Sequence, residues 1–505
     1  MKTRPRFRFM MLIGILFQFS GNAVAQDWPG IRDSLYSDVL KEQRVIQVIL
    51  PKDYTPDSNE KYEVLYILDG EWYMEQVPFI YNFAMNAGYV PPSIFVLIPN
   101  TYVDNVNLRD RDFSPSRINN APNLGGADNF HSFLKNELIP HVERKYPANG
   151  QKTLLGSSFS GLFAVYAFVK EPGLFQSYVA SDPNLNWDNG YVSKLAYEKL
   201  PDFSGITSTL FIAGLDQSFG NMGIEAMDAA LQAKAPESLH WKCIPYTDET
   251  HYSVQHKAFY DGLRFSHFGY STKPPEYHPM NGILEKDKAL KVFILNENPA
   301  VRYTIDGSEP TPASAMMKRG NILTLSEPTQ LKIRSFTNRV QYEQTSQGSF
   351  ITDGLIPTII NSKTAKSTQL NYAYFEGDWE KVPDFRKLKP LQSGMIDKDF
   401  QINKLTDENA AFLIEGPFEV FEDGYYIFVV DSENGSKLFV GDQLVIDRDG
   451  VVSKTMQSFA LPLKKGIYPV RLELLRKKGA RDLHFSVYQT KPGNDQWWQT
   501  EFFRF

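Results

Sequence analysis

A serine between two small residues is the first candidate for chemistry in this sequence. Ser158 follows the strand-like run Thr153–Leu155 and precedes the apolar, helix-like run Leu162–Val169. Gly156 lies two positions before it and Ser160 two positions after it, which is the pattern G-x-S-x-G with serine in the last place. The other two serines of this turn have a large residue where the pattern needs a small one. Such a turn holds its serine in a strained, exposed conformation, so the pattern predicts that Ser158 is a nucleophile.

A serine hydroxyl is a weak nucleophile until a base takes its proton, and histidine is the usual base. The chain has eight histidines, and one of them, His251, lies in the loop after the strand-like run Leu239–Tyr246. A histidine downstream of the serine is the order found with the G-x-S-x-G turn. We therefore expect His251 to be the base, with His256 as the second choice.

An acidic residue should hold the histidine in place and stabilise it when it is charged. Asp216 follows the strand-like run Thr209–Ala213, between the nucleophile and the base, and is the expected acid. Three other acidic residues remain alternatives: Asp182, Asp248 and Glu249. A serine–histidine pair without a strong acid partner also remains open.

Two backbone N–H groups should stabilise the oxyanion of the reaction. One is that of Phe159, directly after the nucleophile, and the other is that of Gly70 or Glu71, in the loop after an early strand. The aromatic side chains expected to contact substrate are Trp72 and Trp187. The sequence has no metal-binding or phosphate-binding motif, so we expect no metal site and no cofactor.

Strand-like and helix-like segments alternate through the first half of the chain. Arg44–Leu50, Tyr62–Leu68 and Ile94–Ile98 are predicted strands, and Ala127–Tyr146 has the apolar spacing of a helix, kinked at Pro140. This alternation predicts an α/β fold for residues 26–272, with a mostly parallel sheet and helices on both faces. In such sheets the site lies beyond the carboxyl ends of the strands, where the candidate residues fall.

The composition of the whole chain limits the binding partners and the cellular location that we expect. Net charge is −6, which gives no general attraction to nucleic acid or anionic membranes. A basic, then apolar N-terminus with a small-residue cleavage site predicts that residues 1–25 are a signal peptide and that the protein is exported to the periplasm or beyond. No later run is long and apolar enough to cross a membrane. Cys243 is the one cysteine, so no disulfide can form within the chain.

From about Pro274 the helical patterns give way to short strands and turns. Residues 274–354 are predicted to form a small β-sandwich, and residues 368–505 a second all-β domain. No candidate catalytic residue lies beyond His251, so we expect the chemistry to be separable from both β-rich segments.

Several motifs resemble a known esterase family, which includes esterase D, ferric-siderophore esterases, and feruloyl and acetyl xylan esterases. They are Arg44–Pro51, Val64–Gly70, Arg111–Pro115 and Phe130–Tyr146, and the resemblance runs from about Val39 to Phe268. It implies an α/β-hydrolase fold and ester hydrolysis. In this family the turn that carries the nucleophile usually reads Gly-His-Ser-x-Gly-Gly. Here Ser157 replaces the histidine, and Ser160 replaces the first of the two adjacent glycines.

The β-rich segments carry resemblances of their own. Val301–Pro312 is similar to the C-terminal domain of chitobiase and β-hexosaminidase. The region from about Leu370 to Thr490 resembles the protective-antigen-type β-sandwich, which accompanies many secreted glycan-active enzymes. These resemblances make a glycan-binding surface an expected feature.

The sequence therefore predicts a secreted serine carboxylesterase that acts on acyl esters of small molecules or polysaccharides, such as acetyl or feruloyl esters. The alternative within enzymes is a siderophore trilactone esterase. The alternative from another class is a glycan-binding protein whose hydrolase domain is inactive.

Overall fold

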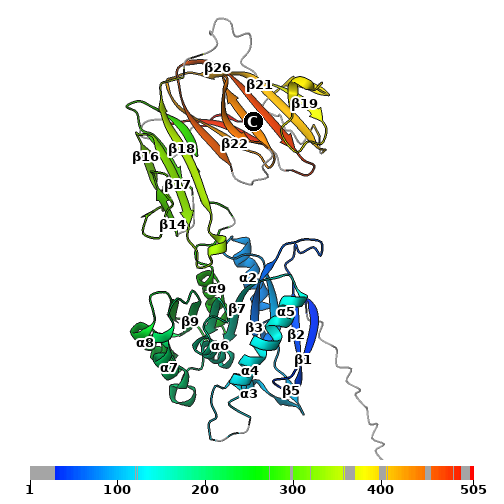
Figure 1. Cartoon of the computed structure of the whole chain (residues 1–505), viewed down its shortest axis with the longest axis vertical. Helices are drawn as coiled ribbons and strands as arrows, with labels where there is room; N and C mark the ends of the chain where they lie inside the picture. The colour runs from blue at the N-terminus through cyan, green and yellow to red at the C-terminus, as the bar shows by residue number, and fades with distance from the viewer. Residues whose placement is uncertain are drawn as a thin grey trace, which may run out of the picture.

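The computed structural model describes residues 29–505, except residues 120, 122, 272, 296–299, 319, 357, 359–369, 397–404, 407, 450–455, 481–482, 491–500 and 505, and of residues 501–504 it describes only the backbone. Figure 1 shows an elongated molecule with an α/β part at its foot, a β-rich part above it and a narrow middle between them. The predicted signal peptide lies outside the described residues.

The α/β part is built on one eight-stranded sheet with the order β1-β2-β4-β3-β7-β8-β9-β10. The first strands pair antiparallel, and all pairs from β4 to β10 are parallel. The strand bounds are β1 Ile31–Ser37, β2 Glu42–Ile49, β3 Tyr62–Leu68, β4 Ser93–Ile98, β7 Ala148–Ser157, β8 Ser177–Ser181, β9 Thr209–Leu215 and β10 His240–Tyr246. A two-stranded ribbon lies apart from it, formed by β5 Tyr102–Val103 and β6 Val106–Asn107.

Helices cover both faces of this sheet, as predicted. The described α-helices are α1 Gly70–Tyr73, α2 Gln76–Asn86, α3 Arg109–Phe113, α4 Ala127–Phe133, α5 Ile139–Lys145, α6 Phe159–Lys170, α7 Trp187–Lys199, α8 Ile224–Lys234 and α9 Val254–Ser266. Buried residues of α2 and α9 form the core on one face, and those of α4 to α8 form the core on the other. The predicted α/β-hydrolase-like fold is therefore confirmed.

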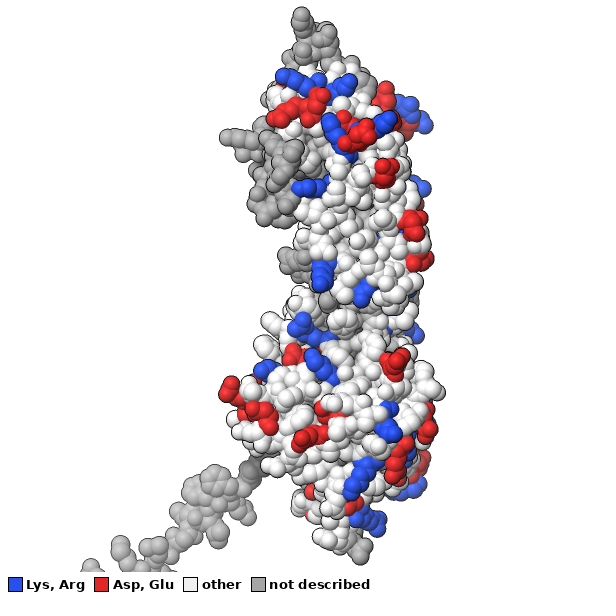
Figure 2. Space-filling view, turned by 90° about the vertical axis from the view of Figure 1, so that its left-hand side faces the viewer, with Lys and Arg blue, Asp and Glu red and all other residues white. Residues whose placement is uncertain are grey.

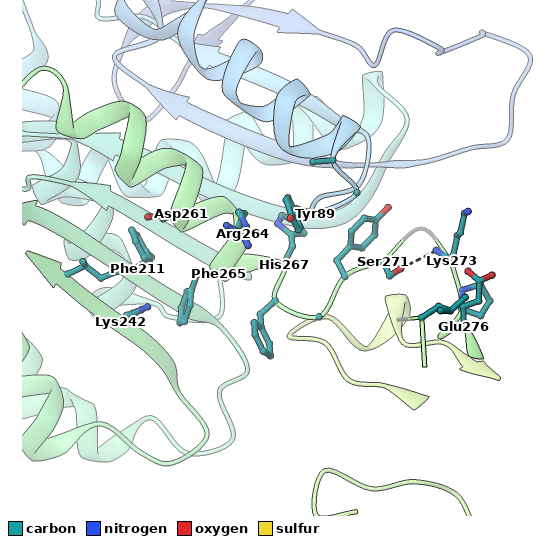
Figure 3. A pocket seen from close by; sticks show the side chains of 18 residues that line it. Tyr89, Phe211, Lys242, Asp261, Arg264, Phe265, His267, Ser271, Lys273 and Glu276 are labelled. Carbon is teal, nitrogen blue, oxygen red and sulfur yellow. Dashed lines mark hydrogen bonds between the residues drawn. The ribbon is translucent and has the colours of Figure 1, made fainter. Parts of the chain in front are cut away.

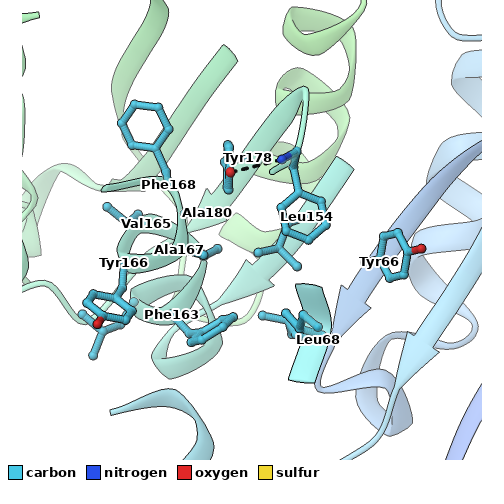
Figure 4. Close-up of a cluster of buried hydrophobic side chains, with 14 of the residues drawn as sticks. Tyr66, Leu68, Leu154, Phe163, Val165, Tyr166, Ala167, Phe168, Tyr178 and Ala180 are labelled. Atoms are coloured by element: carbon cyan, nitrogen blue, oxygen red, sulfur yellow. Dashed lines mark hydrogen bonds between the residues drawn. The ribbon is translucent and has the colours of Figure 1, made fainter. Parts of the chain in front are cut away.

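Strand β3 shows how these two cores are separated. Val64, Tyr66 and Leu68 point into the larger core, where Figure 4 shows Tyr66 and Leu68 on the side of helix α6. Leu65 and Ile67 point into the core below α2 and α9. All these side chains are fully buried, because a strand covered on both faces can be apolar at every position.

The predicted kink at Pro140 takes a different form in the structure. A short π-helix, Leu134–Leu138, separates α4 from α5, and Pro140 stands in the first turn of α5. The residues at both junctions keep right-handed helical backbone angles, so the helix continues through Pro140 and the π-helical turn lies just before it.

The described residues of the β-rich part form three sheets, with the orders β11-β13-β16, β15-β14-β17-β18-β12-β25-β22-β27-β28 and β20-β19-β21-β26-β23-β24. Its bounds are β11 Tyr277–His278, β12 Asn281–Glu285, β13 Leu290–Ile294, β14 Val301–Thr304, β15 Ala315–Met316, β16 Ile322–Leu325, β17 Thr329–Ser335, β18 Thr345–Asp353, β19 Asn371–Glu376, β20 Gln392–Met395, β21 Ala410–Val420, β22 Gly424–Asp431, β23 Ser436–Val440, β24 Gln443–Arg448, β25 Gln457–Leu463, β26 Gly466–Arg476, β27 His484–Gln489 and β28 Glu501–Arg504.

One sheet joins the two predicted β-rich segments. Strand β12 pairs with β18 on one side and with β25 on the other, and both pairings are parallel. Gly282 lies opposite Ala460, and an added side-chain carbon on Gly282 would lie 3.0 Å from the Ala460 oxygen. The segments 274–354 and 368–505 therefore share a continuous sheet.

A buried arginine connects the β-rich part to the α/β sheet, at the end where its parallel strands begin. Arg339, in the loop between β17 and β18, forms an ion pair with Glu63 at the start of β3. The same guanidinium donates to Thr153 Oγ1 at 2.9 Å and to Ser177 Oγ at 3.1 Å. His267 Nε2 lies 2.9 Å from Glu63 Oε2. All five side chains are buried, so the joint is part of the protein's interior.

Among the described residues, the structure contains no helix that is long and apolar enough to cross a membrane.

Candidate active site

Ser158 stands at the turn between strand and helix that the sequence predicts. Strand β7 ends at Ser157, helix α6 begins at Phe159, and Ser158 between them has φ 56° and ψ −115°. An added side-chain carbon on Gly156 would lie 2.5 Å from the Ser160 oxygen, so only glycine fits there. The positive φ and the close approach of helix to strand are the geometry of a nucleophile elbow.

Ser160 stabilises this turn. Its Oγ accepts a hydrogen bond from the Ser157 N–H at 2.9 Å and donates to the Ser157 carbonyl oxygen at 2.8 Å. Both residues are fully buried. A glycine at position 160 could make neither bond. The Ser160 side chain therefore adds two hydrogen bonds to the turn that carries Ser158.

His251 pairs with Asp182. Its Nδ1 lies 2.6 Å from Asp182 Oδ2, and Nδ1 is the donor because a carboxylate only accepts. The Asp182 side chain is 2% exposed and that of His251 39% exposed. A buried carboxylate on Nδ1 leaves Nε2 as the proton-accepting nitrogen.

The turn that carries Asp182 is bonded to the elbow. The Ser158 N–H donates to the Ser181 oxygen at 2.9 Å, and the Asn184 N–H donates to the Ser158 oxygen at 3.1 Å. Asp182 itself has φ 40°, and its N–H donates to Ala213 on the neighbouring strand β9 at 2.6 Å. The candidate nucleophile and the acidic residue therefore belong to one hydrogen-bonded unit.

The expected pairing of His251 with Asp216 is wrong. After β9 the chain turns into a 3-10 helix, Asp216–Ser218, and the exposed Asp216 carboxylate accepts from the Gln217 N–H at 2.7 Å. Glu249 accepts from the Ser253 hydroxyl at 2.5 Å. Asp248 is exposed, and so is His256, the second choice for the base.

The predicted oxyanion donors lie at helix starts. Phe159 opens α6, and Gly70 and Glu71 open α1. N–H groups in the first turn of a helix have no acceptor within that helix, so they remain available to an anion. An added side-chain carbon on Gly70 would lie 2.7 Å from the Ile98 N, so strand β4 requires a glycine there.

Arg109 links the two sets of donors, and the sequence did not single it out. Its guanidinium makes two bonds to Asp69, of 2.7 and 2.8 Å, directly before Gly70. It also lies over the rings of Trp72, at 4.9 Å, and Phe159, at 5.8 Å. Burial alone would lower the pKa of Arg109, but the bonds and charge of Asp69 raise it, so the guanidinium stays charged.

Both predicted substrate-contacting tryptophans lie beside these donors. The Trp187 ring is 5.0 Å from the ring of Phe159, edge to face, and its Nε1 donates to Ser116 Oγ at 3.1 Å. Trp72 is 51% exposed and holds its ring against Arg109. Aromatic side chains therefore lie next to the turn that carries Ser158.

The described residues contain no group of His, Cys, Asp and Glu side chains that could hold a metal ion. The hydroxyl, imidazole, carboxylate and N–H groups of the site are those of nucleophilic acyl transfer.

Comparisons with known families match two separate parts of the chain. Residues 37–257 match the family described as "Putative esterase", and residues 364–496 match the PA14 domain. The chain thus carries an esterase-family domain followed by a PA14 domain.

Individual relatives are similar over parts of the chain. Ferri-bacillibactin esterase BesA of Bacillus subtilis is 28% identical over 34% of this chain and 65% of its own length. The siderophore triacetylfusarinine C esterase of Aspergillus fumigatus is 32% identical over 16% of this chain and 28% of its own length. An IroE-like serine hydrolase from Shewanella oneidensis, known as a crystal structure, is 31% identical over 46% of this chain and 78% of that chain, with a TM-score of 0.41. The chain spans less than two thirds of both curated relatives.

Proposed function

We propose, from the premise that residues 37–257 are a serine hydrolase domain of the esterase family, that this protein hydrolyses carboxylic esters through an acyl-enzyme on Ser158. The observation that carries the proposal is the bond between His251 Nδ1 and Asp182 Oδ2, next to a serine on a strained elbow. Buried carboxylate, histidine and serine in this arrangement are the working parts of a triad.

The proposed reaction has two halves. Ser158 Oγ attacks the acyl carbon while His251 Nε2 takes the hydroxyl proton, and the same proton then leaves with the alcohol. Asp182 holds Nδ1–H and stabilises the imidazolium. The oxyanion accepts from the Phe159 N–H and from Gly70 or Glu71. Water then repeats the attack on the acyl-enzyme with His251 again as the base, which releases the acid and restores the serine.

The proposed substrate is an ester of a carbohydrate or an aryl acid, such as an acetyl or feruloyl ester. The PA14 match and the tryptophans beside the elbow support this class. The alternative is a siderophore ester, supported by the names of the curated relatives. An intact Ser158, His251 and Asp182 argue against a glycan-binding protein with an inactive hydrolase domain.

We further propose that the protein is exported, because residues 1–25 have the pattern of a signal peptide. The PA14 segment would then hold the enzyme on a glycan, and residues 274–354 would be a chitobiase-type connecting sandwich.

One substrate panel separates these proposals. Initial rates are measured on p-nitrophenyl acetate, methyl ferulate, acetylated xylan and a ferric trilactone siderophore, with Ser158→Ala as the blank. We expect turnover of the first three substrates to exceed turnover of the trilactone. Preference for the trilactone would move the assignment to siderophore release, and turnover of none of them would contradict the esterase proposal.

A further inference from the structure

A cavity lies where the α/β part meets the β-rich part. It has a volume of about 720 Å3 and is lined by the end of α9, the start of β10 and the linker after residue 266. Figure 3 shows Tyr89, Arg264 and His267 close together in it. The cavity is at the opposite end of the sheet from Ser158, so it is not part of the proposed active site.

None of the three cations around this cavity forms an ion pair with a described residue, although the bond to His278 and, after it, the charge of Lys273 lower the pKa of Glu276. Lys242, Arg264 and Lys273 line it, and no carboxylate of a described residue lies within ion-pair distance of any of the three. The two carboxylates of the lining are already engaged: Asp261 accepts from the Tyr246 hydroxyl at 2.6 Å, and Glu276 lies 3.0 Å from His278 Nε2.

The charge on the surface around the cavity also favours an anion at this place. On the face shown in Figure 2, Lys and Arg side chains gather around the narrow middle of the molecule, although the whole chain has a net charge of −6. The positive character of the cavity is therefore local and comes from its own lysine and arginine side chains.

Exposed aromatic rings lead from this cavity toward the active site. Arg264 lies 4.3 Å from the ring of Tyr89 and 5.4 Å from that of Tyr260, and Tyr260 lies 5.9 Å from Phe83. Phe79 stands one helical turn before Phe83 on α2, and the two rings are 74% and 60% exposed. Large apolar rings left in water at this spacing indicate a binding surface.

The rings reach the catalytic end of the sheet. Tyr252 is 78% exposed, and its ring lies 5.9 Å from that of His251. It stands just before α9, which has 13 residues and is thus about 20 Å long. The ring track is defined as Tyr252, Phe79, Phe83, Tyr260 and Tyr89. It has members at both ends of this helix: Tyr252 beside the candidate base, and Tyr260 and Tyr89 beside Arg264 at the cavity.

We propose that the ring track and the junction cavity bind one extended, carboxylate-bearing polysaccharide chain, whose ester reaches Ser158. Flat, partly polar rings suit the apolar faces of successive sugar units. The Arg264 guanidinium, whose central carbon lies 4.3 Å from the centre of the Tyr89 ring, donates to a sugar carboxylate. A compact ligand at Ser158 would not reach a cavity one helix length away, so the track selects a polymer. This inference rests on the proposed esterase function for its last step only.

Binding is tested without catalysis in the full-length Ser158→Ala protein. The probes are glucuronoxylan and the same polymer after chemical reduction of its carboxyl groups. We expect Phe83→Ala to weaken binding to both polymers about tenfold, which corresponds to about 1.4 kcal/mol. We expect Arg264→Gln to weaken binding to glucuronoxylan about tenfold and to leave binding to the reduced polymer unchanged.

Two control variants show whether a loss of binding is specific to this surface. Phe421→Ala and Arg386→Gln change side chains of the same types that are exposed on the β-rich part, and we expect neither to alter binding. Unchanged affinity in both test variants, or an equal loss in the controls, would overturn the proposal, because the polymer would then be held elsewhere.

Activity separates this proposal from the proposed function. With Ser158 intact, Phe83→Ala and Arg264→Gln should leave turnover of p-nitrophenyl acetate unchanged and raise KM for acetylated glucuronoxylan. If the predicted binding losses occur and no ester is hydrolysed, the esterase assignment fails while the polysaccharide surface stands. If esters are hydrolysed and both variants bind glucuronoxylan normally, the surface fails and the esterase stands.

Discussion

Arg339 of the β-rich part and Glu63 of the α/β part form a buried ion pair at the joint between them, and the side chains are 2% and 1% exposed. Tyr342 donates to the other carboxylate oxygen of Glu63 at 2.8 Å, and Asn338 Nδ2 donates to the Phe265 oxygen at 2.9 Å. The β17–β18 loop thus supplies the α/β part with a cation and several donors that its own sequence lacks. The β-rich part should therefore add to the stability of the α/β part.

Arg339→Gln should lower the free energy of unfolding by about 3–5 kcal/mol, because it leaves Glu63 buried without its arginine. Urea denaturation of the full chain measures this loss. Turnover of a small ester by folded protein should not change, since the joint and Ser158 are at opposite ends of the sheet. Arg386→Gln, at an exposed arginine paired with Asp384, is the matched control and should hardly move the unfolding midpoint. A similar midpoint for both variants would contradict the role given to Arg339.

Acid should weaken this joint in two steps. Burial alone would raise the pKa of Glu63, but Arg339 and His267 lower it to about 2 from the ordinary 4.5. The unfolded chain binds this proton first, so the contribution is complete above about pH 4.5 and is lost as the pH falls toward 2. Burial also lowers the pKa of His267 from 6.5, so the unfolded chain takes up a proton below that pH before the folded chain does. Unfolding midpoints of wild type and Glu63→Gln between pH 7 and pH 3 test this. The unfolding midpoint of Glu63→Gln should change less with pH than that of the wild type. Parallel pH profiles would contradict the role given to the Glu63 carboxylate.

A chain that ends at Tyr270 should still turn over a small soluble ester, because no residue of the candidate site lies beyond His251. It should also unfold at a lower temperature than the full chain, since it lacks Arg339 and uncovers Glu63, Thr153 and Ser177. Calorimetry and a p-nitrophenyl acetate assay on the same sample measure both quantities. A folded, stable and inactive fragment would mean that the β-rich part completes the site.

Asp182→Asn should lower kcat about 10⁴-fold, because the amide NH2 can donate to Nδ1 and so place the ring proton on Nε2, and because the neutral amide does not stabilise the imidazolium. Asp216→Asn should stay near wild type, since that carboxylate faces solvent. Asp248→Asn and Glu249→Gln serve as further controls. The largest loss in any of these three, with Asp182→Asn nearly unaffected, would show that the acid is elsewhere.

What the sequence predicted correctly is mainly local. The strained turn at Ser158 follows from three small residues within five positions, and the buried strand β3 follows from a continuous apolar run. Each of these signals lies within one segment, so neighbouring segments did not have to be placed in space.

The acid and the joint depend on contacts between distant segments. Asp182 and Asp216 both follow apolar strands, and the sequence gives no sign that a 3-10 turn directs Asp216 to solvent. Arg339 and Glu63 are 276 positions apart, and neither stands in a motif. Arg109 lies in a polar loop whose spacing does not show that it would fold against Asp69. Tertiary geometry decided all three.

We propose above all that Ser158 is a nucleophile activated by His251. The most direct measurement is covalent labelling of the full chain with a fluorophosphonate, with the site mapped by tandem mass spectrometry. We expect an adduct on Ser158, no adduct in Ser158→Ala, and labelling of His251→Ala slowed by several orders of magnitude. An adduct on another serine, or labelling of His251→Ala at the wild-type rate, would contradict it.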